Sequence, residues 1–216
     1  MSWDLGLRWH LEQTADQAPD LDTYDPLPMP FVRDQHLRSP NGSVEDEYIQ
    51  HLIRVSYREA ERVTRRPLVP QGRTMVLDRF PCGTGAIELG PNLLSVESID
   101  YIDTEGADQQ LAGSPEMFQT SAPSGEKPAN GYITPLYGET WPSTRFQAGA
   151  VRVTFQQGYP IVDGAVRIPE DITHARLLII GELYKQRSLS VHAFNQNPAI
   201  IQARSYFVRY RAHRGY

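Results

Sequence analysis

Several features common in secreted, membrane and metal-binding proteins are missing from this 216-residue sequence. Cys82 is the only cysteine, which excludes a disulfide framework and a cysteine-based metal cage. The longest strongly apolar run, 177–180, is far too short to cross a bilayer. The N-terminus has neither the basic region nor the apolar core of a signal peptide. We therefore expect a soluble intracellular protein with no membrane contact.

Acidic residues are missing from the C-terminal part of the chain. None follows Glu182, whereas the last 34 residues contain six basic ones: Lys185, Arg187, Arg204, Arg209, Arg211 and Arg214. Because the whole chain carries a net charge of −5, residues 1–182 carry −11. Charge sorted in this way is typical of a chain with two different partners or surfaces. A net-acidic body argues against general nucleic-acid binding by that part.

Patterns of known catalytic and metal sites are also missing. The six histidines do not lie at metal-ligand spacing. Gly83 and Gly85 precede no predicted helix, so we expect a hairpin turn there rather than a nucleotide site. No serine lies in a nucleophile-elbow context, and Cys82 has no adjacent base. The sequence predicts no enzyme activity, no catalytic residue, no metal and no cofactor.

The first of three predicted helices spans about 43–66. Its apolar residues recur at helical spacing, and arginines followed by Pro67 suit its C-terminal end. Ser43 and Asp46 resemble a capping box, with aspartate in place of the usual glutamate. We therefore expect this helix to begin with a side-chain cap and to bury one face.

The second predicted helix, 169–187, opens with Pro169 and two acidic residues. Its apolar face is broad enough to need burial on two sides, by the first helix and by something else. Three residues that widen this face are candidates for a contact between subunits: Leu177, Ile180 and Tyr184. Asn197 and Pro198 form a cap and first turn, which predicts a third helix over about 197–210.

Residues 67–160 are predicted to form a β-rich insertion between the first two helices. Strand-like stretches lie at 74–80, 86–89, 94–102, 132–135 and 151–155, and a long excursion lies at 114–130. A phase change near Ser98 indicates a β-bulge. The predicted fold class is therefore α+β, with a core over 43–187 that consists of helix, β-rich insertion and helix.

Residues 1–42 have the composition of an N-terminal arm, since the segment is acidic, turn-rich and then proline-rich. Apolar residues alternate from Trp3 to Trp9. This pattern fits a short strand, a hook lying on a neighbouring subunit, or a poorly ordered terminus. In the second case, Trp3 and Trp9 belong to the subunit interface.

Residues 188–216 have the composition of a docking tail. Aromatic residues and arginines alternate there, and they are the types enriched at protein-interface hot spots. The residues concerned are Arg204, Tyr206, Phe207, Arg209, Tyr210, Arg211, Arg214 and Tyr216. Arginines and aromatics also bind nucleic acid, and a solvated face with no partner is the third interpretation. The aromatic content favours a protein partner.

An ordered series of motifs over 44–187, about two thirds of the chain, resembles the head–tail connector (adaptor) proteins of tailed bacteriophages and gene transfer agents. The group concerned is the gene-product-6-like connectors. The motifs are the acidic start of the first helix, Val-Leu-Asp-Arg-Phe-Pro at 76–81, Ile-Glu-Leu at 87–89, Leu-Ser-Val-Glu-Ser-Ile at 94–99, Asp-Thr-Glu-Gly at 103–106, Pro-Leu-Tyr-Gly-Glu-Thr-Trp-Pro at 135–142, and the final strand and helix.

This resemblance implies a structural virion protein in the neck, assembled in the cytoplasm of the host bacterium. It implies a ring, typically twelvefold, that lies beneath the portal, continues the DNA channel and carries a stopper, head-completion or tail protein. Double-stranded DNA would pass through the lumen without sequence-specific binding. The resemblance also implies that the C-terminal segment reaches the portal, so removal of residues 197–216 should leave a folded subunit that cannot attach. The alternative is a DNA-binding packaging or head-completion factor that uses the basic tail.

Overall fold

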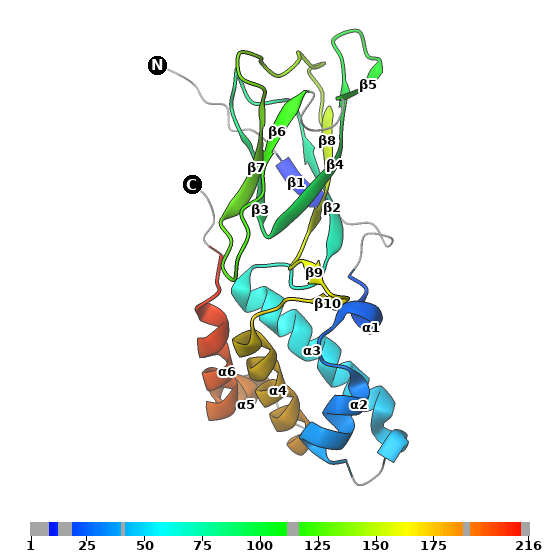
Figure 1. Ribbon diagram of the computed structural model, residues 1–216, viewed down its shortest axis with the longest axis vertical. Coiled ribbons are helices and arrows are strands. Elements are labelled where there is room, and N and C mark those ends of the chain that lie inside the picture. The colour runs from blue at the N-terminus through cyan, green and yellow to red at the C-terminus, as the bar shows by residue number, and fades with distance from the viewer. Residues whose placement is uncertain (1–8, 13–18, 40–41, 112–116, 188–190, 213–216) are drawn as a thin grey trace. The chain divides into compact units, whose positions relative to one another are not determined.

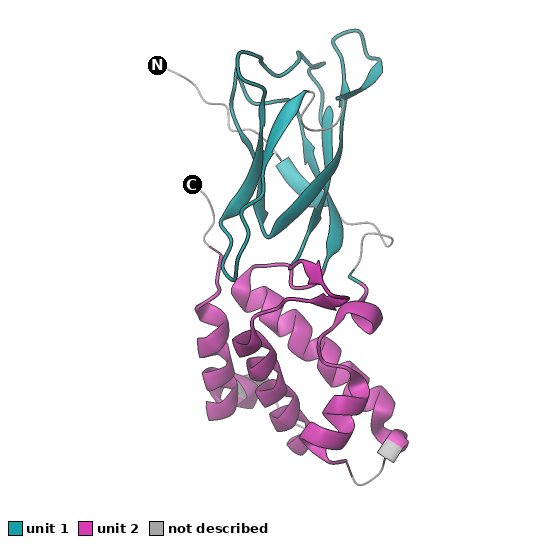
Figure 2. Ribbon diagram, viewed as in Figure 1, with its two compact units in different colours: residues 1–19, 70–158, 214–216 teal, residues 20–69, 159–213 magenta. Residues whose placement is uncertain are grey.

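The computed structural model describes residues 9–12, 19–39, 42–111, 117–187 and 191–212. The chain divides into two compact units (Figure 2). The β unit comprises residues 1–19, 70–158 and 214–216, and the helical unit comprises 20–69 and 159–213. Most of the expected arm and tail therefore belongs to the helical unit and packs within it.

The β unit contains two antiparallel sheets (Figure 1). The five-stranded sheet has the order β1-β2-β8-β4-β5, with β1 Trp9–Glu12, β2 Gln71–Leu77, β8 Val151–Gln157, β4 Leu93–Ile102 and β5 Asp108–Leu111. The three-stranded sheet has the order β3-β7-β6, with β3 Ile87–Pro91, β7 Asn130–Pro135 and β6 Phe118–Ser121. Buried residues from both sheets form one hydrophobic core.

Strand β8 shows why the alternating sequence forms a strand. Val151, Val153 and Phe155 are fully buried, whereas Arg152 between them is exposed. Side chains alternate between the two faces of a strand, so one face joins the core and the other meets solvent. The ladder between β4 and β8 shifts register between Val96 and Ser98, which confirms the predicted bulge.

The connections in the β unit differ from the sequence prediction. Strands β2 and β3 belong to different sheets, so the turn at Gly83 and Gly85 is a crossing between sheets and not a hairpin. The excursion at 114–130 includes β6, and β5 was not predicted. These two strands lie at sheet edges and contain mostly polar residues, so they lack the apolar alternation that marks a strand.

The helical unit contains the three predicted helices, which confirms the α+β class. They are α3 Asp46–Thr64, α4 Glu170–Lys185 and α6 Pro198–Val208. The smaller elements are α1 Leu21–Tyr24, α2 Met29–Phe31, a π-helix Val32–Leu37, a 3-10 turn Gly42–Glu45, the hairpin β9 Ile161–Val162 and β10 Ala165–Val166, and α5 Val191–Gln196.

The two helix starts proposed from sequence have different outcomes. The side chain of Asn197 accepts hydrogen bonds from the backbone N–H groups of Ala199 and Ile200, which confirms it as the cap of α6. The predicted capping box at α3 is wrong, because the helix begins after Glu45 without a side-chain cap. Instead, both carboxylate oxygens of Asp46 accept from Nη1 of Arg33, at 3.1 and 3.0 Å.

Helix α4 is buried on several sides within its own unit. Ile172, Ala175 and Ile179 join a core that includes α3 and α6. Ile180 belongs to a second hydrophobic core, together with Leu27 and Val32 from the segment before α3. The other buried residues of this core lie on α3. The broad apolar face predicted from sequence is thus covered by α3, by α6 and by the segment 27–37.

A buried ion pair ties three segments of the helical unit together. The Arg176 side chain on α4 is fully buried, and its two terminal nitrogens donate to the Asp25 carboxylate at 2.7 and 2.6 Å. Its remaining donors reach the Ser56 hydroxyl and the Ile53 carbonyl on α3, both at 3.3 Å. A bidentate guanidinium–carboxylate pair fixes orientation as well as charge, so the position of Asp25 is set by α3 and α4.

Replacement of Asp25 by asparagine should destabilise the helical unit strongly. The substitution leaves the buried Arg176 guanidinium without a counter-charge, and loss of one partner from such a pair costs about 3–5 kcal/mol. Urea denaturation followed by circular dichroism measures the effect. Asp22→Asn is the matched control, because Asp22 is well exposed and its distant pairing with Arg54 is worth less than about 1 kcal/mol. Equal, small losses for both variants would contradict a stabilising role for the buried pair.

Candidate protein-interaction surfaces

The C-terminal segment folds onto the helical unit. Ile200, Ala203 and Phe207 on α6 are fully buried in the core that contains α3 and α4. After the helix, the Ala212 N–H donates to the Thr64 carbonyl at 2.7 Å, and the Arg66 guanidinium donates to the Tyr210 carbonyl. Residues 198–212 therefore complete the core, and deletion from 197 onward would expose it rather than leave a folded subunit.

The structure separates the predicted docking residues into buried and accessible ones. Phe207 and Tyr210 are core residues, so their side chains are not available to a partner in this fold. Tyr206 is half-buried, and its ring packs edge-on against His174 at 5.8 Å between centroids. Arg211 is exposed. Arg214 and Tyr216 lie outside the described residues.

Two accessible apolar residues on α6 escaped the sequence prediction. Ile201 is 53 % exposed and Val208 is 54 % exposed. They lie two helical turns apart with the exposed Ser205 between them, on the side of α6 away from its buried stripe. The sequence does hold a signal for them, because each follows directly after another apolar residue. In each pair only the first residue, Ile200 or Phe207, belongs to the buried stripe, so the second is left exposed.

Arginines flank this apolar strip on both sides. Arg204 donates to the Glu59 carboxylate at 2.7 Å and lies over the Phe194 ring at 5.2 Å. Arg209 lies over the Tyr206 ring at 5.1 Å and 3.8 Å from the Asp171 carboxylate. An apolar centre with a charged rim is the usual anatomy of a protein interface. We call Ile201, Ser205 and Val208, with these flanking arginines and Arg211, the α6 face.

The acidic partner of Arg204 has a perturbed pKa. Burial raises the pKa of Glu59, but hydrogen bonds from Arg62 and Arg204 outweigh burial and hold the pKa below its usual value of 4.5. Glu59 is therefore ionised at neutral pH and joins α3 to α6. Acidic residues of the same unit therefore neutralise part of the basic charge of the C-terminal segment.

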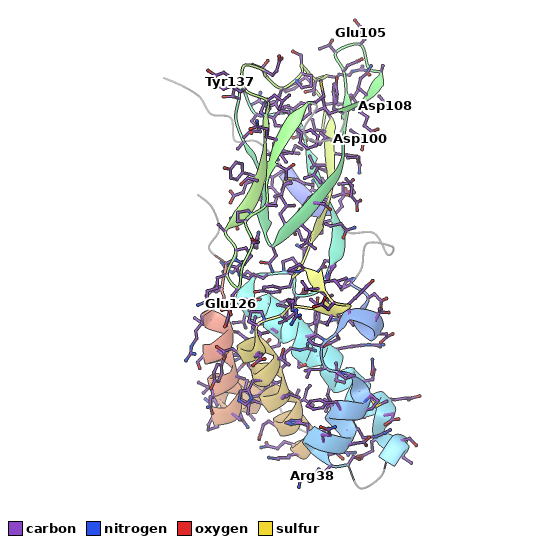
Figure 3. The ribbon with its side chains drawn as sticks, viewed as in Figure 1. Arg38, Asp100, Glu105, Asp108, Glu126 and Tyr137 are labelled. Atoms are coloured by element: carbon purple, nitrogen blue, oxygen red, sulfur yellow. The ribbon has the colours of Figure 1, made fainter. Side chains whose placement is uncertain are left out.

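A second candidate surface lies on the connection from β7 to β8, residues 136–150. The connection is anchored by Trp141, whose ring stacks on Phe80 at 4.9 Å and whose indole N–H donates to the Gly85 carbonyl at 2.7 Å. Tyr137 and Phe146 project from it almost fully exposed. Figure 3 shows Tyr137 at the same end of the β unit as Glu105 in the β4–β5 turn. We call Tyr137 and Phe146 the β-loop face.

The residues proposed for contact between subunits also separate. Ile180 is fully buried within the chain, and Leu177 and Tyr184 pack partly buried against the same core. The Tyr184 hydroxyl donates to the Glu45 carboxylate, which also accepts from Arg187. Trp9 on the edge strand β1 is 58 % exposed and keeps an accessible ring. Trp3 lies outside the described residues.

The two units carry different charge. The β unit contains 13 acidic and 7 basic residues, a net charge of −6, and the helical unit contains 13 acidic and 14 basic residues, a net charge of +1. The charge boundary seen at Glu182 along the sequence thus becomes a difference between an acidic β unit and a nearly neutral helical unit. A partner that docks by charge would distinguish the two.

Neither a metal-binding cluster nor a membrane-spanning helix is found among the described residues. Within that part of the chain, no group of three or more histidine, cysteine, aspartate or glutamate side chains is placed to hold a metal ion. No helix among the described residues is long and apolar enough to span a bilayer.

The fold is shared with proteins of known particles. A chain in the neck of an empty GTA particle computed with C6 symmetry matches with a TM-score of 0.70 and 22 % identity, over 96 % of this chain and 97 % of that chain. A chain in the virion of a native gene transfer agent particle matches with 0.68 and 22 %, over 95 % and 97 %. A chain in the neck of a native GTA particle computed with C12 symmetry matches with 0.62 and 18 %, over 96 % and 97 %. Neither the protein-family models nor the curated proteins contain a match.

The Glu59 link should make stability depend on pH. Because its pKa is lowered in the folded state, the link contributes fully above the unfolded value of 4.5 and is lost as pH falls through the folded pKa. At neutral pH, Glu59→Gln should lower the free energy of unfolding by about 1–2 kcal/mol. The difference from wild type should shrink in acid, as measured by urea denaturation from pH 7 down to pH 3. Glu47→Gln, an exposed position on the same helix, is the control. A difference that stays constant with pH would contradict the assignment.

Proposed function

We propose that this protein is a structural subunit of the neck of a tailed-phage-like particle. The observation that carries the proposal is the shared fold, which extends over almost the whole length of this chain and of chains in gene transfer agent necks. If the two folds had only a β-sandwich or a pair of helices in common, only part of each chain would match. Here the helical unit, the β unit and their order along the chain are matched together.

Within the neck, the proposed role is that of a head–tail connector, or adaptor. Twelve copies would form a ring beneath the portal, extend the DNA channel and carry a tail-side stopper or head-completion protein. The solved necks were computed with C6 and C12 symmetry, which supports a ring with many equivalent subunits. The proposed location is the virion neck, with assembly in the cytoplasm of the host bacterium. Such a role requires no catalysis.

The α6 face is the proposed portal-binding surface. Its exposed Ile201 and Val208 supply apolar anchors, and Arg204, Arg209 and Arg211 surround them. Arginine and apolar anchors dominate the energy of many interfaces. The face lies on a helix whose opposite side is buried, so it is held in place before the partner arrives and little ordering is needed on binding.

The β-loop face is the proposed surface for a second partner. A neck protein between head and tail must bind two different neighbours, and this face lies on the other compact unit of the chain. Tyr137 and Phe146 are large, exposed and mounted on a connection that Trp141 anchors to Phe80. Large aromatic side chains held rigidly in this way are typical binding anchors.

The alternative role, a packaging factor that binds DNA through the basic tail, has less support. Arg204 and Arg209 both lie against carboxylates of their own unit. Phe207 and Tyr210 are buried and cannot stack on bases. Within the described part of the tail, what stays accessible is an apolar strip with a charged rim, which fits a protein groove better than a phosphate backbone.

Replacement of Ile201 and Val208 by serine should abolish attachment to portal-bearing heads. Both side chains are exposed, so the fold should keep its thermal stability within a few degrees. Attachment is measured by mixing purified protein with heads that carry the portal and separating bound from free protein by sedimentation. The expected result is at least a tenfold loss of bound protein, because truncation of hot-spot residues typically costs about 2 kcal/mol or more.

The matched control is Ile161→Ser with Val162→Ser. These residues are exposed to a similar degree, belong to the same unit and lie on the β9 hairpin away from α6 in the sequence. The control should attach like wild type. Attachment of the α6 variant at the wild-type level would rule out α6 as the portal-binding surface, and failure of wild type itself to attach would count against the neck function.

A further inference from the structure

Helix α3 carries a line of basic side chains along its exposed face. Arg54, Arg58 and Arg62 follow each other at intervals of four residues, and His51 lies three residues before them. This spacing keeps these four on one side of the helix, and Arg65 follows as the C-cap residue just beyond its last turn. With a rise of about 1.5 Å per residue, the line from His51 to Arg62 is about 17 Å long. We call these five residues the α3 arginine stripe.

The stripe lies on the side of α3 opposite its buried residues and is accessible to solvent. The Arg54 and Arg62 side chains are 52 % and 63 % exposed. Arg54 lies 3.6 Å from the Asp22 carboxylate, and Arg62 donates to Glu59 at 2.8 Å. Within the described part of the chain, Arg58 and Arg65 form no ion pair. The stripe therefore keeps two unneutralised guanidinium groups.

The stability of the helix does not explain the stripe. Like charges four residues apart repel each other on a helix surface, so Arg54, Arg58 and Arg62 in series weaken α3. A glutamate in the middle position would pair with both neighbours instead. The arrangement is therefore unfavourable in the isolated subunit and would become favourable when a polyanion binds.

The chemistry of the stripe fits phosphate better than a protein surface. None of the large hydrophobic side chains that are exposed in the described residues belongs to α3, in contrast to the α6 face. Protein interfaces are poor in charge at their centre and rely on apolar anchors. A guanidinium group can donate two parallel hydrogen bonds to a phosphate, and duplex DNA presents a regular line of phosphates.

We propose that the α3 arginine stripe binds the phosphate backbone of duplex DNA without sequence specificity. The proposal rests on the proposed neck function for the identity of the polyanion, and it assigns to α3 the surface that faces DNA in the channel. It differs from the expectation that a net-acidic body is not a general nucleic-acid binder. The net charge of −11 over residues 1–182 gives no indication of the stripe, because acidic residues elsewhere outnumber its arginines.

The test measures binding of the full-length protein to a fluorescein-labelled duplex of about 30 base pairs by anisotropy. Non-specific binding of this kind has Kd values of about 1–100 µM, so high protein concentrations are needed. If four arginines each neutralise one phosphate, raising the salt from about 50 to 200 mM should weaken binding about 150-fold. Arg58→Gln with Arg65→Gln should bind more weakly, and the same salt change should weaken it only about 12-fold.

Three further variants test whether the effect is specific to the stripe. Arg145→Gln with Arg167→Gln removes the same charge from exposed positions outside the stripe and should bind DNA like wild type. Arg209→Gln with Arg211→Gln should also bind DNA like wild type, since the α6 face is assigned to protein. Arg58→Glu should lose DNA binding while its melting temperature stays level or rises, because it relieves the repulsion along α3.

Several outcomes would overturn the proposal. One is wild-type affinity and salt dependence in the α3 double variant; another is a loss of binding in the Arg145 and Arg167 control of the same size. A change of oligomeric state in the α3 variants with DNA binding intact would reassign the stripe to a contact between subunits. The neck function is tested separately by attachment to heads, so a stripe that fails to bind DNA in a protein that attaches normally would refute this inference alone.

Discussion

The helical unit depends on one buried charge. Arg176 has no access to solvent, and its guanidinium is satisfied by Asp25 and by two groups of α3. An isolated charge in an apolar core is very costly, so the segment that contains Asp25 must lie against α3 and α4 whenever the unit is folded. That segment leads into residues 27–37, which cover Ile180 and complete the second core. The same ion pair therefore orders the N-terminal part of the unit and closes the face of α4 that is not covered by α6.

With that side of α4 closed, α6 covers the other side and turns its own outer face to solvent. The fold thereby sorts residues that look alike in sequence: Phe207 is core, and Val208 is surface. Charge is sorted in the same way, because Arg204 lies against Glu59 whereas Arg58 has no counter-ion among the described residues. Among the described residues, the accessible surface includes an apolar strip with a charged rim, a pair of exposed aromatics, and a line of arginines. Three chemically distinct faces suit a subunit that meets several neighbours in one assembly.

Much of this fold follows from sequence, and the exceptions have physical reasons. Long periodic segments are predictable because one face of each is buried, and burial imposes the period. The helix predicted over 43–66 is observed over 46–64, and the strand predicted over 151–155 is observed over 151–157. The edge strand β5 was missed because its mostly polar residues show no such period. The sequence does not separate buried from accessible residues in the predicted docking tail, because aromatic residues and arginines serve both cores and interfaces. Only the packing of α6 shows that Tyr210 is buried. Helix-to-helix pairing between positions more than a hundred residues apart, as for Glu59 and Arg204, has no local signal in one sequence.

The proposed function requires that identical copies of this chain assemble as a ring in a particle neck. The fold shared with neck chains, the exposed Trp9 on an edge strand and the separate faces proposed for other partners all fit that assembly. The most direct measurement is electron microscopy of the purified full-length protein, alone and bound to portal-bearing heads, with the rotational symmetry determined from averaged end views. The expected result is a closed ring, or an added ring-shaped layer on the portal with twelvefold symmetry. A protein that stays monomeric in both preparations and adds no density to the portal would contradict it.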